Sequence, residues 1–170
     1  TDMSNLRLIN ETTATSVSSL TVDNIFSADF DIYKMIIDND NTTNNVMKMR
    51  LVNSSGSVVN TNKYDYANLQ LKATTTFSED KNTNFNEFRG LYEALEGNSA
   101  VVYFFNPFSS SSYTFRLHQA QSFYTTNYPL GAKGIGVLKQ TSSITGINIF
   151  QTGSAFSYLN IRTYGLRVDS

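Results

Sequence analysis

The sequence predicts an all-β protein: a single antiparallel β-sandwich over residues 1–170, jelly-roll-like, with about eight to ten strands. Three observations predict this fold. Apolar side chains recur with a period of two, polar turn segments separate the periodic runs, and the chain contains only two prolines. A chain of 170 residues suits one core, and we expect less than about 15% helix.

The clearest alternation lies in two runs. In residues 46–52, apolar Met47, Met49 and Leu51 alternate with basic residues, which is typical of a strand with one wet face. In residues 64–72 a similar alternation follows a polar turn that contains a glycine. We expect these two strands to face each other across a hairpin.

Two further runs, 31–38 and 100–105, are apolar at nearly every position. Strands that are apolar on both faces are usually central or covered, so both are expected inside the sheet arrangement. The remaining strand candidates are residues 15–22, 113–121, 134–139, 144–150 and 158–168.

One segment departs from this period. Apolar side chains recur at helical spacing at Phe85, Phe88, Leu91 or Tyr92, and Leu95. Gly90 would cost such a helix about 1 kcal/mol relative to alanine. A short helix and an irregular loop with apolar anchors therefore remain equal alternatives here.

Composition excludes several classes of function. The 13 Lys and Arg are scattered along the chain and face 14 Asp and Glu, so no cationic surface for nucleic acid is expected. The absence of Cys excludes thiolate nucleophiles, disulfides and Cys-type metal sites. No apolar run approaches 18 residues, so no membrane span is predicted.

His118 is the one histidine, and a catalytic triad would have to use it. The chain has no Gly-x-Ser-x-Gly motif, and a single His without Cys builds no His-rich or Cys-rich metal site. We therefore predict a protein that is not an enzyme and has no cofactor. His118 is expected to be a solvated or hydrogen-bonded surface residue on a strand.

Two polar segments offer weaker alternatives. Residues Asp38 to Asn41 bring four oxygen-bearing side chains together, and we predict a polar turn, with a Ca²⁺ site as the alternative. An EF-hand loop would need Gly and Glu where this chain has Thr43 and Met49. Residues 131–136 hold three glycines, but not in the order of a phosphate-binding loop, so a flexible loop entering a strand is predicted.

Four segments carry a resemblance to a known family. They are Phe104-Phe105-Asn106-Pro107-Phe108 with the Ser-rich turn and Tyr113-Thr114-Phe115 after it, Thr15 to Leu20 before Phe26, the strand from Phe30 to Ile37, and Tyr158 to Leu166 with its Tyr164-Gly165 pair. Together they resemble the β-sandwich domains of tailed-bacteriophage virions.

This resemblance implies a non-enzymatic virion structural protein located on the phage particle. Because the chain contains nothing similar to a fibre shaft, we expect a capsid decoration or accessory subunit that docks on the major capsid protein or another virion protein. The alternative is a tail-fibre or tail-tip domain that binds a glycan or protein receptor on the host surface.

The resemblance also implies a homo-oligomer, and a trimer is expected. Low surface charge favours this because it weakens repulsion between copies. The aromatic residues in or next to predicted loops are the candidate partner contacts: Phe108, Tyr113, Tyr124 and Tyr128. Ordinary packing beneath a loop is the alternative interpretation of these four residues.

Overall fold

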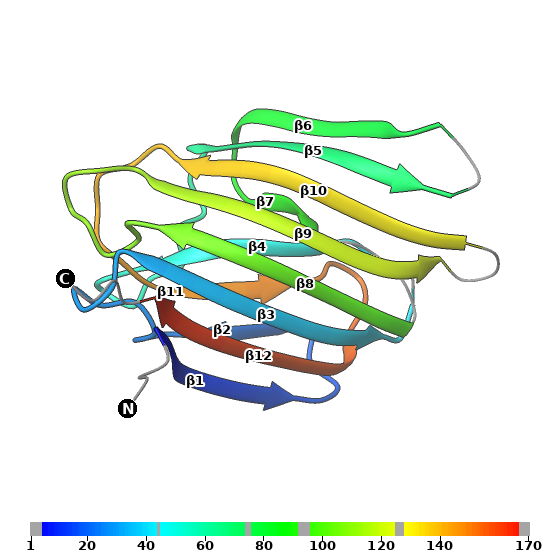
Figure 1. The fold of residues 1–170 in the computed structure, drawn as a ribbon, viewed down its shortest axis with the longest axis horizontal. Coiled ribbons are helices and arrows are strands. Elements are labelled where there is room, and N and C mark those ends of the chain that lie inside the picture. The colour runs from blue at the N-terminus through cyan, green and yellow to red at the C-terminus, as the bar shows by residue number, and fades with distance from the viewer. Residues whose placement is uncertain (1–4, 44, 74–75, 92–95, 125–127, 167–170) are drawn as a thin grey trace.

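The computed structural model describes residues 5–43, 45–73, 76–91, 96–124 and 128–166. Within these residues the chain forms strands and turns, with no helix, and every strand pairing is antiparallel. The strands form two sheets that stack face to face (Figure 1). The predicted antiparallel β-sandwich is therefore confirmed. A helix able to cross a membrane is absent from the same residues.

Twelve strands divide unequally between the two sheets. In chain order they are β1 (Leu6–Ala14), β2 (Ser19–Val22), β3 (Ile32–Asn41), β4 (Met47–Asn53), β5 (Tyr64–Lys72), β6 (Ser78–Phe85), β7 (Phe88–Leu91), β8 (Glu96–Phe105), β9 (Thr114–Tyr124), β10 (Tyr128–Leu138), β11 (Ile144–Phe150) and β12 (Phe156–Leu166). The large sheet has the order β1-β12-β3-β8-β9-β10-β5-β6, and the small sheet has the order β2-β11-β4-β7. In Figure 1, β5 and β6 lie at one edge of the large sheet and β1 at the other.

The core lies between the sheets and is filled by alternate residues of the strands. β3 of the large sheet turns Tyr33, Met35 and Ile37 inward, and β4 of the small sheet contributes Met49 and Leu51 to the same cluster. All five side chains are fully buried. The predicted central position of β3 is confirmed, since it lies between β12 and β8.

β4 and β5 do not form the predicted hairpin, because they belong to different sheets. β4 pairs with β11 and β7, whereas β5 pairs with β10 and β6. Tyr64 of β5 nevertheless links them across the core. Its hydroxyl accepts a hydrogen bond from the Leu51 amide at 3.0 Å and donates one to the Val59 carbonyl at 2.7 Å. The periodicity predicted which face of β4 meets the core. In β5 it did not, because Tyr64 and Tyr66 face the core and Ala67 faces outward. It did not predict which strands pair.

Both alternatives for residues 85–91 are wrong, because this segment contains the end of β6 and all of β7. Phe88 is fully buried in the core from a strand rather than from a helix. Gly90 has φ of 99°, which a helix cannot accommodate and which favours glycine. Tyr92 and Leu95, which completed the predicted helical pattern, lie outside the described residues.

Candidate functional site

The four predicted partner contacts do not form one surface. Phe108 and Tyr113 lie in the β8–β9 connection, where Phe108 is half-buried and Tyr113 is exposed. Tyr124 and Tyr128 pair at the opposite end of β9. The eleven residues of β9 separate the two pairs by about 35 Å at the usual rise of a strand. Their role as contacts stays a prediction.

In the first half of β9 the polar side chains face inward and the apolar side chains face outward, and Gln119 and Gln121 are exposed on the outer side as well. Arg116 and His118 are almost completely buried, whereas Phe115, Leu117 and Phe123 are exposed by 49%, 44% and 53%. This is the reverse of the usual arrangement of a strand over a core. The sequence shows the alternation, but it does not show which set of side chains faces the core.

His118 is therefore not the predicted surface residue, although it is hydrogen-bonded. Its Nε2 lies 3.0 Å from the Gly90 carbonyl oxygen of β7, so Nε2 donates this bond. Burial, together with the positive charge of Arg116, lowers the pKa of His118 to about 3. The ring is therefore neutral at pH 7. The side chain is 1% exposed and borders a depression on the outer face of the sheet.

Arg116 explains why the polar side of β9 can face inward. Its guanidinium donates to the Arg89 carbonyl at 2.5 Å and stacks over the Phe88 ring at 4.4 Å. Burial lowers the pKa of Arg116 to about 9, so the group remains charged at pH 7. β7 thus supplies carbonyl oxygens and an aromatic face to the two polar side chains of β9.

The glycine-rich segment 131–136 belongs to strand β10, so the prediction of a flexible loop is wrong. Gly134 lies between β5 and β9, beside Asn68 and His118. A Cβ at Gly134 would lie 2.2 Å from Asn68 Oδ1 and 2.7 Å from the Ala67 carbonyl oxygen. The close packing of Asn68 and His118 on the inner side of the sheet therefore requires glycine at this position. We call these buried polar residues, with Arg116, the inner polar layer.

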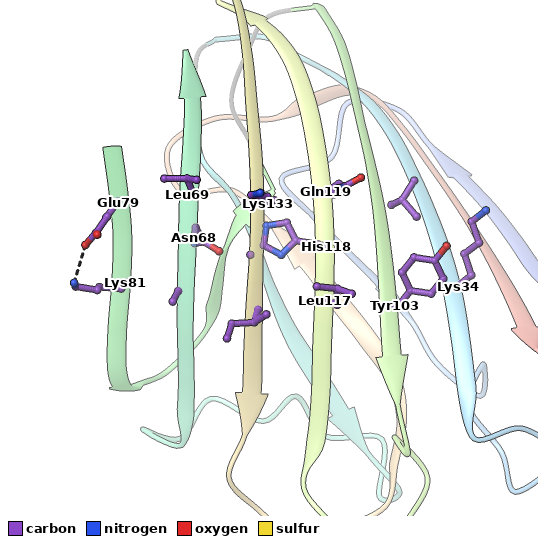
Figure 2. A pocket seen from close by; sticks show the side chains of 14 residues that line it. Lys34, Asn68, Leu69, Glu79, Lys81, Tyr103, Leu117, His118, Gln119 and Lys133 are labelled. Carbon is purple, nitrogen blue, oxygen red and sulfur yellow. Dashed lines mark hydrogen bonds and ion pairs between the residues drawn. The ribbon is translucent and has the colours of Figure 1, made fainter. Parts of the chain in front are cut away.

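The outer face of the large sheet, which points away from the small sheet, is hollowed at its centre. Two adjoining depressions of about 890 and 850 Å³ share Ala67, Leu117 and Ile135. We define the outer groove by six side chains that line them: Ala67, Tyr103, Phe105, Phe115, Leu117 and Ile135. Figure 2 shows Tyr103 and Leu117 on neighbouring strands, with Lys34 beyond Tyr103.

Strand register aligns these side chains into rows. Tyr103 of β8 pairs with Leu117 of β9, Leu117 with Ile135 of β10, and Ile135 with Ala67 of β5. Ile135 is 61% exposed, the highest value among the exposed large apolar side chains of the described residues. A contiguous apolar patch of this kind usually marks a binding site.

Three lysines, together with Gln119 and Glu79, line the outer groove beside its apolar floor. Lys34 and Lys133 form no ion pair with any described residue, whereas Lys81 pairs with Glu79 at 2.7 Å (Figure 2). The groove therefore combines apolar floor residues with a positive rim. This chemistry suits the binding of an amphipathic ligand rather than proton transfer.

Residues Asp38 to Asn41 form the end of β3, so the predicted polar turn is wrong. Asp38 pairs with Arg162 and accepts a hydrogen bond from Ser99, while the side chains of Asn39 and Asn41 point inward and bond each other at 3.0 Å. Alternation along a strand sends successive side chains to opposite faces, so these four cannot converge on Ca²⁺. Among the described residues, no group of three or more acidic or histidine side chains could hold a metal.

Comparison with known proteins identifies no family. No family model matches the chain, and no curated protein matches it. Among solved structures, it is similar to the CspB protease of Clostridium perfringens, with 11% identity, a TM-score of 0.39, and coverage of 94% of this chain and 26% of the protease. Sucrose-6-phosphate hydrolase from Lactobacillus gasseri gives 12% identity and a TM-score of 0.39, with 94% and 28% coverage.

An infectious bursal disease virus structure matches at 9% identity with a TM-score of 0.12, covering 95% of this chain and 38% of that one. The chain spans about a quarter of the first two proteins, whose activities therefore belong to much longer chains. All three TM-scores are below 0.5, so no functional argument follows from these similarities.

Proposed function

We propose that this chain is a non-enzymatic structural protein of a tailed-bacteriophage virion, docking on the capsid as a decoration subunit. The observation that supports docking is the exposed outer groove, where Leu117 and Ile135 face solvent at the centre of the large sheet. The assignment to a phage particle comes from the resemblance of segments such as Phe104 to Phe108 and Tyr158 to Leu166.

Localisation on particles tests this function. The purified chain, labelled with a fluorophore, is incubated with intact phage and with capsids that lack tails. A decoration subunit should bind both and should raise the melting temperature of the capsids, since a ligand that binds only the assembled lattice stabilises it by mass action. Binding only at the tail tip would favour the receptor-binding alternative, and binding to no particle would refute both.

The oligomeric state forms a separate part of the proposal. We propose a trimer, with the two ends of β9 at Phe108, Tyr113, Tyr124 and Tyr128 as contact regions. Light scattering of the free chain should then give three times the chain mass of 19.0 kDa. A stable mass of 19.0 kDa at micromolar concentration would contradict an autonomous trimer.

A further inference from the structure

We propose that the outer groove binds a segment of a partner protein in which apolar side chains are flanked by carboxylates. This inference rests on the proposed docking function, to which it adds the binding surface and the chemistry of the partner segment. Three independent observations carry it: the reversed orientation of β9, the row geometry of the groove and the charge of its rim.

The reversed orientation of β9 has a cost that folding alone does not explain. Phe115 and Leu117 remain half exposed, although burying apolar area stabilises a fold by roughly 25 cal/mol per Å². At the same time Arg116 is desolvated without a carboxylate contact in the described structure. Departures of this kind from the usual pattern are expected at functional surfaces.

Row geometry gives the size of the ligand. One row starts at Lys34 on β3, crosses the four central strands β8, β9, β10 and β5, and ends at Lys81 on β6. Five strand spacings of about 4.8 Å give a length of about 24 Å. This length fits about sixteen residues of an α-helix or about seven residues of an extended segment. The four side chains between the lysines are apolar or aromatic.

The charge of the rim selects acidic ligands. Lys34 and Lys133 have no carboxylate partner among the described residues, so a bound carboxylate would meet a cation that no other described group neutralises. Lys81 is already paired with Glu79 and adds less. The groove therefore carries a net positive charge, and an acidic segment complements both its apolar floor and its rim.

The same features disfavour two other occupants. A second copy docked groove to groove would bring Lys34 and Lys133 of both chains into one interface, where like charges repel. A glycan needs several converging hydrogen-bonding groups. Gln119 and Tyr103 line one depression, but the side chains shared by both depressions are Lys81 and the apolar Ala67, Leu117 and Ile135. The experiment below distinguishes both occupants from a partner segment.

The test uses random 16-residue peptides displayed as a library and selected on the immobilised full chain. Selected peptides are synthesised with a fluorophore, and their dissociation constants are measured by fluorescence polarisation. We expect apolar clusters flanked by Asp or Glu, and binding that weakens at least about tenfold in the double variant Lys34→Glu/Lys133→Glu. Binding should also weaken with added salt, because rim charges are screened.

Two matched controls separate the groove from the general surface. Lys63→Glu makes the charge change of one lysine substitution at an exposed lysine outside the groove, and peptide affinity should stay within about twofold of wild type, whereas Lys133→Glu alone should weaken it more. Ile135→Ser should weaken binding, whereas Leu8→Ser, at a residue that is also at least half exposed, should not. Circular dichroism and thermal melting of each variant check that the fold is retained.

Several results would overturn the inference. These are the absence of enriched peptides, enriched peptides without acidic residues, and equal binding to the wild type and the double charge variant. Saturable binding on a glycan array, abolished by Ile135→Ser, would assign the groove to sugars. A mass of two chains that reverts to one in Ile135→Ser would assign it to a second copy. If labelled protein remains on capsids while these variants change nothing, the inference fails but the docking function stands.

Discussion

The two outer faces of the sandwich treat their charged residues differently. On the small sheet, Glu87 is buried and accepts ion pairs from Arg89 at 3.0 Å, Arg50 at 3.5 Å and Lys48 at 3.7 Å. The Phe150 ring lies beneath two of these cations. Each of the three cations on this face therefore has an ion-pair partner, and one carboxylate serves all three.

On the large sheet, Lys34 and Lys133 of the outer groove have no such carboxylate among the described residues, and Ile135 between strands β9 and β5 is mostly exposed. We call the small-sheet face complete because each of these three cations has an ion-pair partner, whereas the large sheet exposes apolar area beside two cations that have none among the described residues. The difference supports the proposal that the outer groove binds a partner.

The largest expected loss of stability follows from a substitution on the complete face, that of the small sheet. Glu87→Gln keeps the side-chain shape but leaves three cations without their shared carboxylate. Removing one partner of a buried ion-pair network is strongly destabilising, and partial exposure of the cations moderates this to about 2 to 3 kcal/mol in the free energy of unfolding. Urea denaturation measures the change.

Glu79→Gln at the rim of the outer groove is the matched control. Its pair with Lys81 is fully exposed, so no measurable loss of stability is expected there. Equal losses in the two variants would contradict the distinction between the two faces.

The second expected loss of stability concerns the inner polar layer, which lies beneath the outer groove. Gly134→Ala should lower the free energy of unfolding by about 2 kcal/mol, because the new methyl group would overlap the Asn68 side chain and the Ala67 carbonyl. The control is Gly153→Ala, where no atom lies within 4 Å of the added Cβ and only the positive φ of 76° opposes the change. Thermal melting should show the larger loss at Gly134, and the reverse order would contradict the packing argument.

The sequence predicted the sandwich because residues such as Met47, Met49 and Leu51 alternate cleanly and face the core as expected. It also carried an early sign of the outer groove, since Tyr103 and Phe105 make the predicted strand at 100–105 apolar on both faces. That pattern predicts a central or covered strand, and β8 is central, but the described chain leaves its outer side uncovered.

The location of His118 could not be predicted from its strand alone. A strand of alternating polar and apolar residues fits a core in either orientation, and the choice here depends on β7, which is distant in sequence. Gly90 provides a carbonyl for His118, and Phe88 provides an aromatic face for Arg116. β7 was itself missed, because its four residues are too short to show a period and Phe88 also fitted a helical spacing.

The third effect is a pH dependence of stability. The pKa of His118 is about 3 in the folded chain and about 6.5 when unfolded, so the unfolded chain binds more protons between these values. Stability should therefore fall as the pH drops below about 6.5, by about 1 kcal/mol between pH 7 and pH 5.5. Urea denaturation at both pH values measures this loss. In His118→Gln the loss should largely disappear, and an unchanged pH dependence would show that another group causes it.

The smallest expected change in the free energy of unfolding comes from replacing a single apolar residue on each of the two faces. Ile135→Ser in the outer groove should change the free energy of unfolding by no more than about 0.5 kcal/mol, because the side chain is 61% exposed. Phe150→Ser on the small sheet should cost about 1 kcal/mol or more, since it removes the ring beneath Arg50 and Lys48.

Binding of an anionic naphthalene dye should show the opposite order of effects. The dye has an apolar body and a negative charge, so it matches the outer groove and should bind less to Ile135→Ser than to Phe150→Ser. If Ile135→Ser destabilised the fold more than Phe150→Ser, the exposed isoleucine would be supporting the sandwich itself. The contrast between a complete face and a face that awaits a partner would then be lost.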